Sequence, residues 1–126
     1  MDANGLQQQY KRDAVDTMTQ GELLLMLYDE LIKRLTRADL ALAKEEYETF
    51  EASVDRCLEI VWYLDDTLDK QYPISANLTK LYDFFCYELN RVKIGRNKTE
   101  LDRVRTMIGE LRDSFRTAQQ NNDSGK

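Results

Sequence analysis

The sequence has few residues that break helices and lacks the residue that most often carries acid–base chemistry. Its 126 residues include one proline, five glycines and no histidine. The absence of histidine excludes Ser-His-Asp and Cys-His catalysis, phosphotransfer through histidine and the Glu-x-x-His iron sites of helical bundles. The longest apolar run, Leu23 to Tyr28, is six residues long, whereas about 20 are needed to cross a bilayer. We expect no membrane insertion, and since Met1 to Gly5 shows no secretory signal, we expect a cytoplasmic location.

Charged residues are abundant, and acidic ones are in excess. The 18 Lys and Arg against 23 Asp and Glu give a net charge of 18 − 23 = −5. Nucleic-acid binding needs a larger cationic surface than such a chain offers, so we expect no nucleic-acid partner. Arg105, Arg112 and Arg116 share a helical face, and we interpret them as solvated side chains that partly balance the acidic stretch 47–70. With 42% hydrophobic residues and few helix breakers, the chain predicts one globular domain of long helices.

Four stretches carry apolar residues at alternating steps of three and four, the spacing of an amphipathic helix. The first apolar seam is Leu24, Tyr28, Leu31, Leu35, Ala38 and Leu42, and the second is Tyr47, Phe50, Val54, Cys57, Val61, Leu64 and Leu68. The third is Leu78, Leu81, Tyr82, Phe85, Leu89 and Val92, and the fourth is Leu101, Val104, Ile108, Leu111, Phe115 and Ala118. Four helices with short connections predict an all-α fold, an antiparallel up-down-up-down four-helix bundle.

Local signals set the expected boundaries of these helices. The predicted starts are a capping box at Thr19–Glu22, an N-cap at Ser75 and an N-cap at Asn97 with Glu100 three residues on; the predicted ends are a reversal near Ala43–Glu46 and a C-terminal cap at Gly95. These signals divide the chain into a loosely held N-terminal arm (1–18), a bundle domain (19–118) and a polar tail (119–126).

The residues that often carry chemistry show no catalytic or metal-binding pattern. Cys57 and Cys86 lie 29 residues apart without a Cys-x-x-Cys motif, and we interpret both as small apolar core side chains. Adjacent carboxylates, as in Asp65-Asp66, point about 100° apart on a helix and cannot converge on one atom. We expect no cofactor, no metal and no enzyme activity.

Several apolar residues lie outside the four seams. They are Leu25, Ile32, Leu58, Trp62, Phe84, Tyr87 and Met107. One interpretation is a wider core stripe, because globular helices commonly bury three of seven positions. The other is a groove that receives an amphipathic helix of a partner. On that second interpretation the arm, with Tyr10, Val15 and Met18, covers the groove when it is empty.

Three stretches resemble the FliS family of flagellar export chaperones. They are Tyr10 to Asp29, with Val15, Thr17, Thr19 and Glu22 before Leu23-Leu24-Leu25-Met26-Leu27-Tyr28-Asp29; Asn77 to Phe84; and Glu110 to Phe115. Their order and spacing fit over about residues 10 to 118. The sequence departs from the family at Gln20, Glu30 and Phe115, where proline, glycine and tryptophan are common.

The resemblance implies a cytosolic helical bundle that binds the C-terminal segment of flagellin. It further implies that the chaperone prevents premature polymerisation and helps delivery to the export gate, where FlhA is the docking partner, with the segment around Tyr10 associated with both tasks. Two alternatives stay open from the residues themselves. One is a structural or regulatory bundle that dimerises or binds a regulator through the same apolar faces, and the other is an enzyme that uses carboxylates or Cys86.

Overall fold

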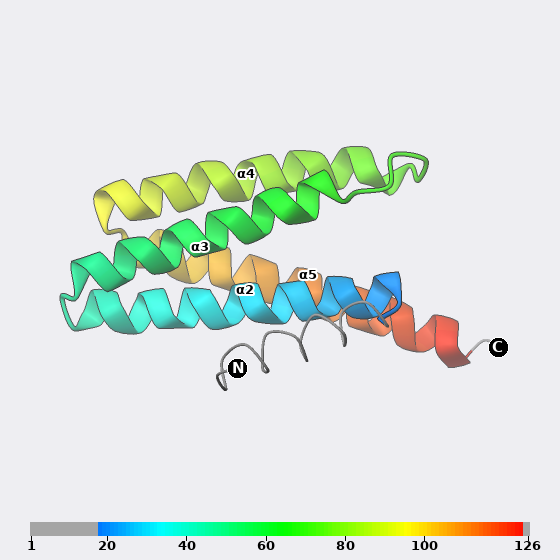
Figure 1. Ribbon diagram of the computed structural model, residues 1–126, viewed down its shortest axis with the longest axis horizontal. Coiled ribbons are helices and arrows are strands. Elements are labelled where there is room, and N and C mark those ends of the chain that lie inside the picture. Colours follow the sequence, from blue (N-terminus) through cyan, green and yellow to red (C-terminus); the bar gives the residue numbers. More distant parts are fainter. Residues whose placement is uncertain (1–17, 125–126) are drawn as a thin grey trace, which may run out of the picture.

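The computed structural model describes residues 18–124, which form helices joined by short turns (Figure 1). The helices are α2 (Gln20–Ala43), α3 (Tyr47–Asp66), α4 (Ile74–Gly95) and α5 (Lys98–Ser124). Successive helices run antiparallel and pack on one another, and α5 also packs on α2, which closes the ring. The predicted antiparallel up-down-up-down four-helix bundle is confirmed. The arm predicted for residues 1–18 lies, except for Met18, outside the described residues.

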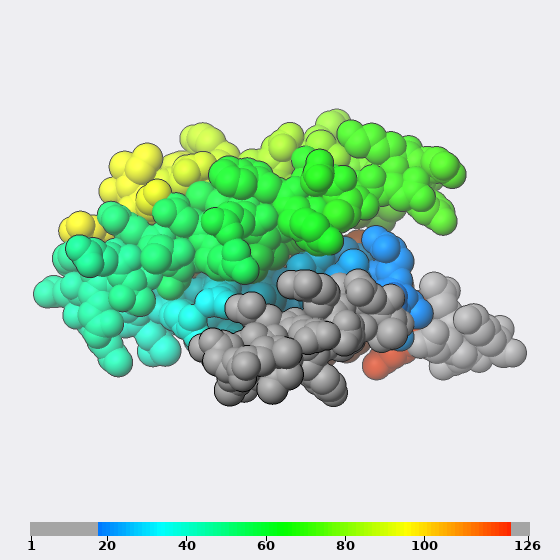
Figure 2. All heavy atoms as spheres, viewed as in Figure 1, coloured from blue at the N-terminus to red at the C-terminus, as the bar shows by residue number. Residues whose placement is uncertain are grey.

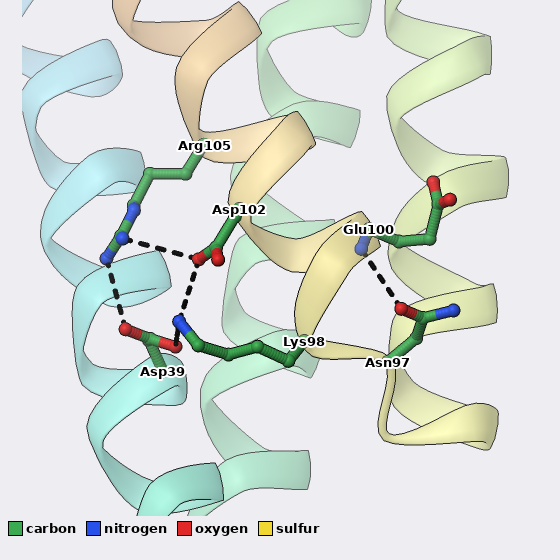
Figure 3. A network of polar contacts seen from close by, with 6 residues as sticks. All are labelled: Asp39, Asn97, Lys98, Glu100, Asp102 and Arg105. Atoms are coloured by element: carbon green, nitrogen blue, oxygen red, sulfur yellow. Dashed lines mark hydrogen bonds and ion pairs between the residues drawn. The ribbon is translucent and has the colours of Figure 1, made fainter.

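Two of the predicted N-caps are present with the expected hydrogen bonds. The Thr19 hydroxyl accepts a hydrogen bond from the Glu22 amide at 3.1 Å. The Asn97 side-chain oxygen accepts one from the Glu100 amide, also at 3.1 Å (Figure 3). Each bond satisfies a backbone donor that the first helical turn leaves without a partner, so α2 and α5 begin where the sequence predicts.

The reversal between α2 and α3 occurs at the predicted place without a glycine. Glu45 adopts a left-handed backbone conformation with φ of 58°. The Glu46 amide donates to the Ala41 carbonyl at 2.9 Å and the Glu45 amide to the Leu42 carbonyl at 3.1 Å. These are the two hydrogen bonds of a Schellman motif, which satisfy carbonyl groups at the end of α2. They offset a backbone strain of about 1–2 kcal/mol for a residue with a Cβ atom.

Both ends of α4 differ from the prediction. Pro73 already has helical angles, φ −56° and ψ −32°, so the helix begins before Ser75, which lies buried within the first turn and does not act as its N-cap. At the other end, Arg96 and not Gly95 is left-handed, with φ of 50°. The Arg96 guanidinium lies over the Tyr47 ring, 3.5 Å from its centroid. This cation–π contact stabilises a conformation that a glycine would otherwise favour.

The core contains the predicted seam residues of all four helices. Fully buried apolar side chains include Leu31, Leu35, Phe50, Val54, Cys57, Val61, Phe85, Leu89, Val92, Leu101, Val104 and Ile108. Toward the end of α5 the same seam becomes less buried, because Leu111 and Phe115 are half-buried and Ala118 is exposed. The helix itself continues past Ala118 to Ser124, so most of the predicted polar tail is helical.

A pair of buried tyrosines connects helices that are not neighbours in the ring. The hydroxyls of Tyr28 (α2) and Tyr82 (α4) form a hydrogen bond of 2.5 Å, and both side chains are essentially inaccessible. Burial raises the pKa of both phenols, so they remain neutral at physiological pH. The Tyr28 ring also stacks on Phe115 of α5, with 5.6 Å between the centroids. One side chain thus contacts two helices besides its own.

We expect Tyr28→Phe to lower the free energy of unfolding by about 1–3 kcal/mol, because it leaves the buried Tyr82 hydroxyl without a partner. The double variant Tyr28→Phe/Tyr82→Phe removes both polar groups and should lose less than the sum of the two single variants. Urea unfolding followed by circular dichroism measures both effects. The exposed Tyr72→Phe serves as the control and should stay within about 0.5 kcal/mol of the parent; strictly additive losses would contradict the coupling.

Candidate functional site

The predicted partner-binding residues do not lie on one surface. Trp62, Phe84 and Tyr87 are exposed, with 57%, 37% and 61% of their surfaces accessible. Half-buried positions are occupied by Met18, Leu25, Ile32 and Met107. Tyr10 and Val15 lie outside the described residues.

Leu58 belongs to the core. Its side chain is 4% exposed and is packed in the same buried cluster as its neighbour Cys57. Helix α3 lies between α2 and α4 and packs on both, so it buries a wider stripe than its seam alone. The expectation that Leu58 faces a partner is thus corrected, and the wider core stripe is the right interpretation at this position.

Phe84 and Met107 face each other's helices across the α4–α5 contact. Glu88 and Glu100 meet here, and their interaction lowers the pKa of Glu88 and raises the pKa of Glu100. Phe84 lies one helical turn before Glu88, and Met107 lies two turns after Glu100, on the same sides of their helices. In this antiparallel pair both positions lie beyond the Glu88–Glu100 contact as seen from the α4–α5 turn, near the middle of α4 and in the first half of α5.

The end of the bundle where α4 begins is less completely closed than the end at the α4–α5 turn. Helices α4 and α5 are close at the turn that joins them and diverge toward the start of α4 (Figure 1). Apolar residues on their facing sides remain half-buried or exposed there; they are Leu81, Phe84, Met107, Leu111 and Phe115. We call these five residues the α4–α5 seam. Periodicity predicts Leu81, Leu111 and Phe115 as core residues, because it does not show where two helices separate.

A pocket of about 350 Å³ lies on another face, between α2 and α3. Its lining contains the apolar side chains of Leu27, Ile60 and Tyr63 together with Arg56 and Glu59. The two charged side chains pair at 2.6 Å, so the rim is polar. The seams do not predict this pocket, although its three apolar residues, Leu27, Ile60 and Tyr63, all lie outside the first and second seams.

Leu25 and Ile32 lie on the side of α2 that faces α5. They share a stripe with Asp39, seven residues further on. Asp39 binds Lys98 at 2.7 Å and Arg105 at 3.5 Å, both from α5 (Figure 3). The partial burial of Leu25 and Ile32 is therefore explained by the α2–α5 contact.

Three arginines of α5 form ion pairs with aspartates of α2 and not with the acidic helix α3. Arg105 pairs with Asp39, and Arg112 and Arg116 approach Asp29 at 3.4 and 3.6 Å. The expectation that they balance the acidic stretch 47–70 is corrected. The reason is topological, because α2 and α5 are neighbours in the ring while α3 packs on α2 and α4.

The described residues offer no arrangement for metal chemistry. Within residues 18–124, no group of three or more His, Cys, Asp or Glu side chains converges to hold a metal ion. Burial raises the pKa of the Cys57 thiol to about 12 and also raises the pKa of Cys86. Both thiols are therefore protonated at neutral pH and are poor nucleophiles.

Comparison with known proteins identifies the family. The sequence model described as flagellar protein FliS matches residues 2–122. The chain belongs to the FliS family. A relative from Bacillus subtilis (strain 168), named flagellar secretion chaperone FliS, is 28% identical over 109 residues, which cover 86% of this chain and 82% of the relative. The resemblance inferred from the three sequence stretches is confirmed.

A solved structure supports the fold independently. The crystal structure of a flagellar chaperone from bacteria superimposes with a TM-score of 0.78, over 95% of this chain and 99% of that chain, at 17% identity. At this identity the likeness concerns the bundle and not its surface. In the part of the chain that the structure describes, no helix has the length and apolar composition for crossing a membrane.

We expect a thiol reagent to modify Cys86 in the native protein and Cys57 only after unfolding, because Cys86 is half-buried and Cys57 is inaccessible. Since the pKa of Cys86 is raised, its labelling rate should rise about tenfold per pH unit between pH 7 and pH 8. Mass spectrometry of peptides after timed labelling distinguishes the two sites. The variant Cys86→Ser should show almost no native labelling, and rapid labelling of that variant would contradict the burial of Cys57.

Proposed function

We propose that this chain is a cytoplasmic export chaperone for flagellin that acts by binding and without catalysis. It binds the C-terminal segment of flagellin, prevents premature polymerisation and helps to deliver flagellin to the export gate through FlhA. The observation that carries the proposal is the incompletely closed α4–α5 seam in a chain of the FliS family. The name of the Bacillus subtilis relative, a flagellar secretion chaperone, supports the same role.

The seam fits an amphipathic helix as its occupant. A helix laid between the diverging α4 and α5 would contact Phe84 and Met107 from opposite sides and would act as a fifth helix of the bundle. An apolar stripe on that helix would be removed from water without any change in covalent structure. Completing the burial of a few half-exposed side chains contributes several kcal/mol before the entropic cost of association, which suits reversible binding of a protein that must later be released.

Polar substitutions in the seam should weaken the binding of a flagellin C-terminal peptide. For Phe84→Ser/Met107→Ser we expect at least about a tenfold increase in Kd, because both apolar contacts are lost. Titration of a fluorescein-labelled peptide followed by anisotropy measures the change. Circular dichroism checks that the variant retains its helices.

The matched control is Leu40→Ser/Ile94→Ser. These two apolar side chains are 58% and 85% exposed, more than Phe84, and lie on other faces of α2 and α4. It should bind the peptide within about twofold of the parent. Equal loss in both variants would argue against a defined site. Loss in Leu27→Ser/Tyr63→Ser and not in the seam variant would place flagellin at the α2–α3 pocket.

Tyr10→Ala tests the role of the arm. If Tyr10 covers the cargo site, we expect the variant to change peptide affinity or flagellin export and to keep the helicity of the parent. The reason is that a cover competes with cargo for the same surface, and its removal abolishes that competition. Loss of helicity would instead make Tyr10 a core residue.

The oligomeric state separates this proposal from the alternative of a structural or regulatory bundle. Sedimentation at several protein concentrations, with and without the flagellin peptide, measures it. A monomer that binds one peptide supports the chaperone. A stable dimer that ignores the peptide supports the alternative.

A further inference from the structure

The α4–α5 seam is bordered by two helices that are attached to the rest of the bundle more firmly than to each other. Among the residues that the structure describes, no ion pair joins α4 to α5. Helix α4 is supported by α3, since the atoms of these two helices form one unbroken surface in the space-filling view (Figure 2). Where α4 and α5 diverge, the contacts that relate their positions pass through α2.

Tyr28 of α2 contacts both helices that border the seam. Its hydroxyl and the Tyr82 hydroxyl of α4 form a hydrogen bond of 2.5 Å. Its ring stacks on Phe115 of α5, with 5.6 Å between the centroids and 22° between the ring planes. A hydrogen bond restricts the distance between its partners, and stacking restricts the orientation of two rings. Because one inaccessible side chain makes both contacts, a displacement of α4 relative to α5 must disturb at least one of them.

The next residue of α2 attaches α5 a second time. Asp29 lies 3.4 Å from the guanidinium of Arg112 and 3.6 Å from that of Arg116. These two arginines stand on either side of Phe115 in the sequence. Partly solvated ion pairs add little stability, but this pair of contacts limits rotation of α5, so Phe115 stays turned toward Tyr28.

We propose that Tyr28 is a positioning residue for cargo binding, which holds α4 and α5 at the spacing that admits a helix into the α4–α5 seam. The inference rests on the proposed function, because it concerns how that seam is prepared for its occupant. Tyr28 does not touch the occupant, since none of its side chain is accessible. It acts through Tyr82 and through Phe115, which is half-buried and belongs to the seam.

A positioning role has a kinetic consequence that differs from the loss of a direct contact. Without the connection through Tyr28, the diverging helices can approach each other, because Leu81 and Leu111 would then bury more apolar surface. A seam that is open in only part of the molecules binds in proportion to the open fraction. Association becomes slower, whereas dissociation is unchanged, since the bound helix itself keeps α4 and α5 apart.

The variant Tyr28→Phe keeps the ring and removes the hydroxyl that bonds α4. We expect the Kd of the fluorescein-labelled flagellin C-terminal peptide to rise about fivefold, as for a seam that is open in about a fifth of the molecules. Stopped-flow anisotropy should show slower association for this variant and faster dissociation for the seam variant Phe84→Ser/Met107→Ser. A Kd of Tyr28→Phe within about twofold of the parent, or a rise caused by faster dissociation, overturns the proposal.

Two further variants separate positioning from stability. Tyr28→Phe/Tyr82→Phe leaves no buried hydroxyl without a partner, so it should be at least as stable as Tyr28→Phe, but its peptide binding should stay weak because the connection is still absent. The control Val54→Ala changes a fully buried side chain of α3. It should lower the urea midpoint and bind the peptide within about twofold of the parent. Affinity that follows stability across these variants would show a merely structural role and would overturn the proposal.

Spin labels measure the spacing of the two helices without any peptide. Lys80→Cys and Ser114→Cys place the labels at exposed positions of α4 and α5, in a Cys86→Ser background because the other cysteine is buried. Pulsed electron paramagnetic resonance should give a shorter or broader distance distribution when Tyr28→Phe is added. Adding Val54→Ala should leave the distribution unchanged. An unchanged distribution in the Tyr28→Phe protein overturns the proposal.

The outcomes distinguish this inference from the proposed function. A parent protein that does not bind the flagellin peptide rejects the proposed function, and the spin labels then still decide whether Tyr28 sets the spacing. A seam variant that loses affinity while Tyr28→Phe keeps it rejects the inference and leaves the proposed function standing.

Discussion

The hydrogen bond between Tyr28 and Tyr82 is the interaction on which the arrangement of this bundle depends. It connects α2 with α4, which are opposite one another in the ring, and the stacking of Tyr28 on Phe115 adds α5. A buried hydroxyl without a partner is costly, so the pair tolerates little relative movement of these helices. The core becomes less buried near it, since Leu111 and Phe115, which stacks on Tyr28, are only half-buried.

The bundle opens near this tyrosine pair. Toward the α4–α5 turn, buried side chains from four helices fill the interior; toward the start of α4, the two helices diverge, and Leu81, Leu111 and Phe115 are only half-buried. A bundle that closed completely would be more stable but would have no apolar surface to offer. Under the proposed function, this incompletely closed end is where a partner helix would be bound and later released.

Ion pairs join neighbouring helices on both sides of the ring. The α2–α5 contact pairs acids with bases, as at Asp39 and Asp29, and these bridges add orientation more than energy because they are largely solvated. The α3–α4 contact is also bridged, by Lys93 and Asp55 at 2.7 Å.

The sequence by itself determined the helices, their order and most of the core, because amphipathic periodicity and capping are local properties. It placed the α2–α3 reversal and the caps at Thr19 and Asn97 correctly, and it failed at Ser75 and Gly95, where Pro73 and the Arg96–Tyr47 contact dominate. Only the tertiary structure decided the fate of apolar residues outside the seams. Leu58 is buried and Trp62 is exposed, although they are four residues apart on one helix, because the positions of neighbouring helices, which no local pattern encodes, decide which side chains are covered.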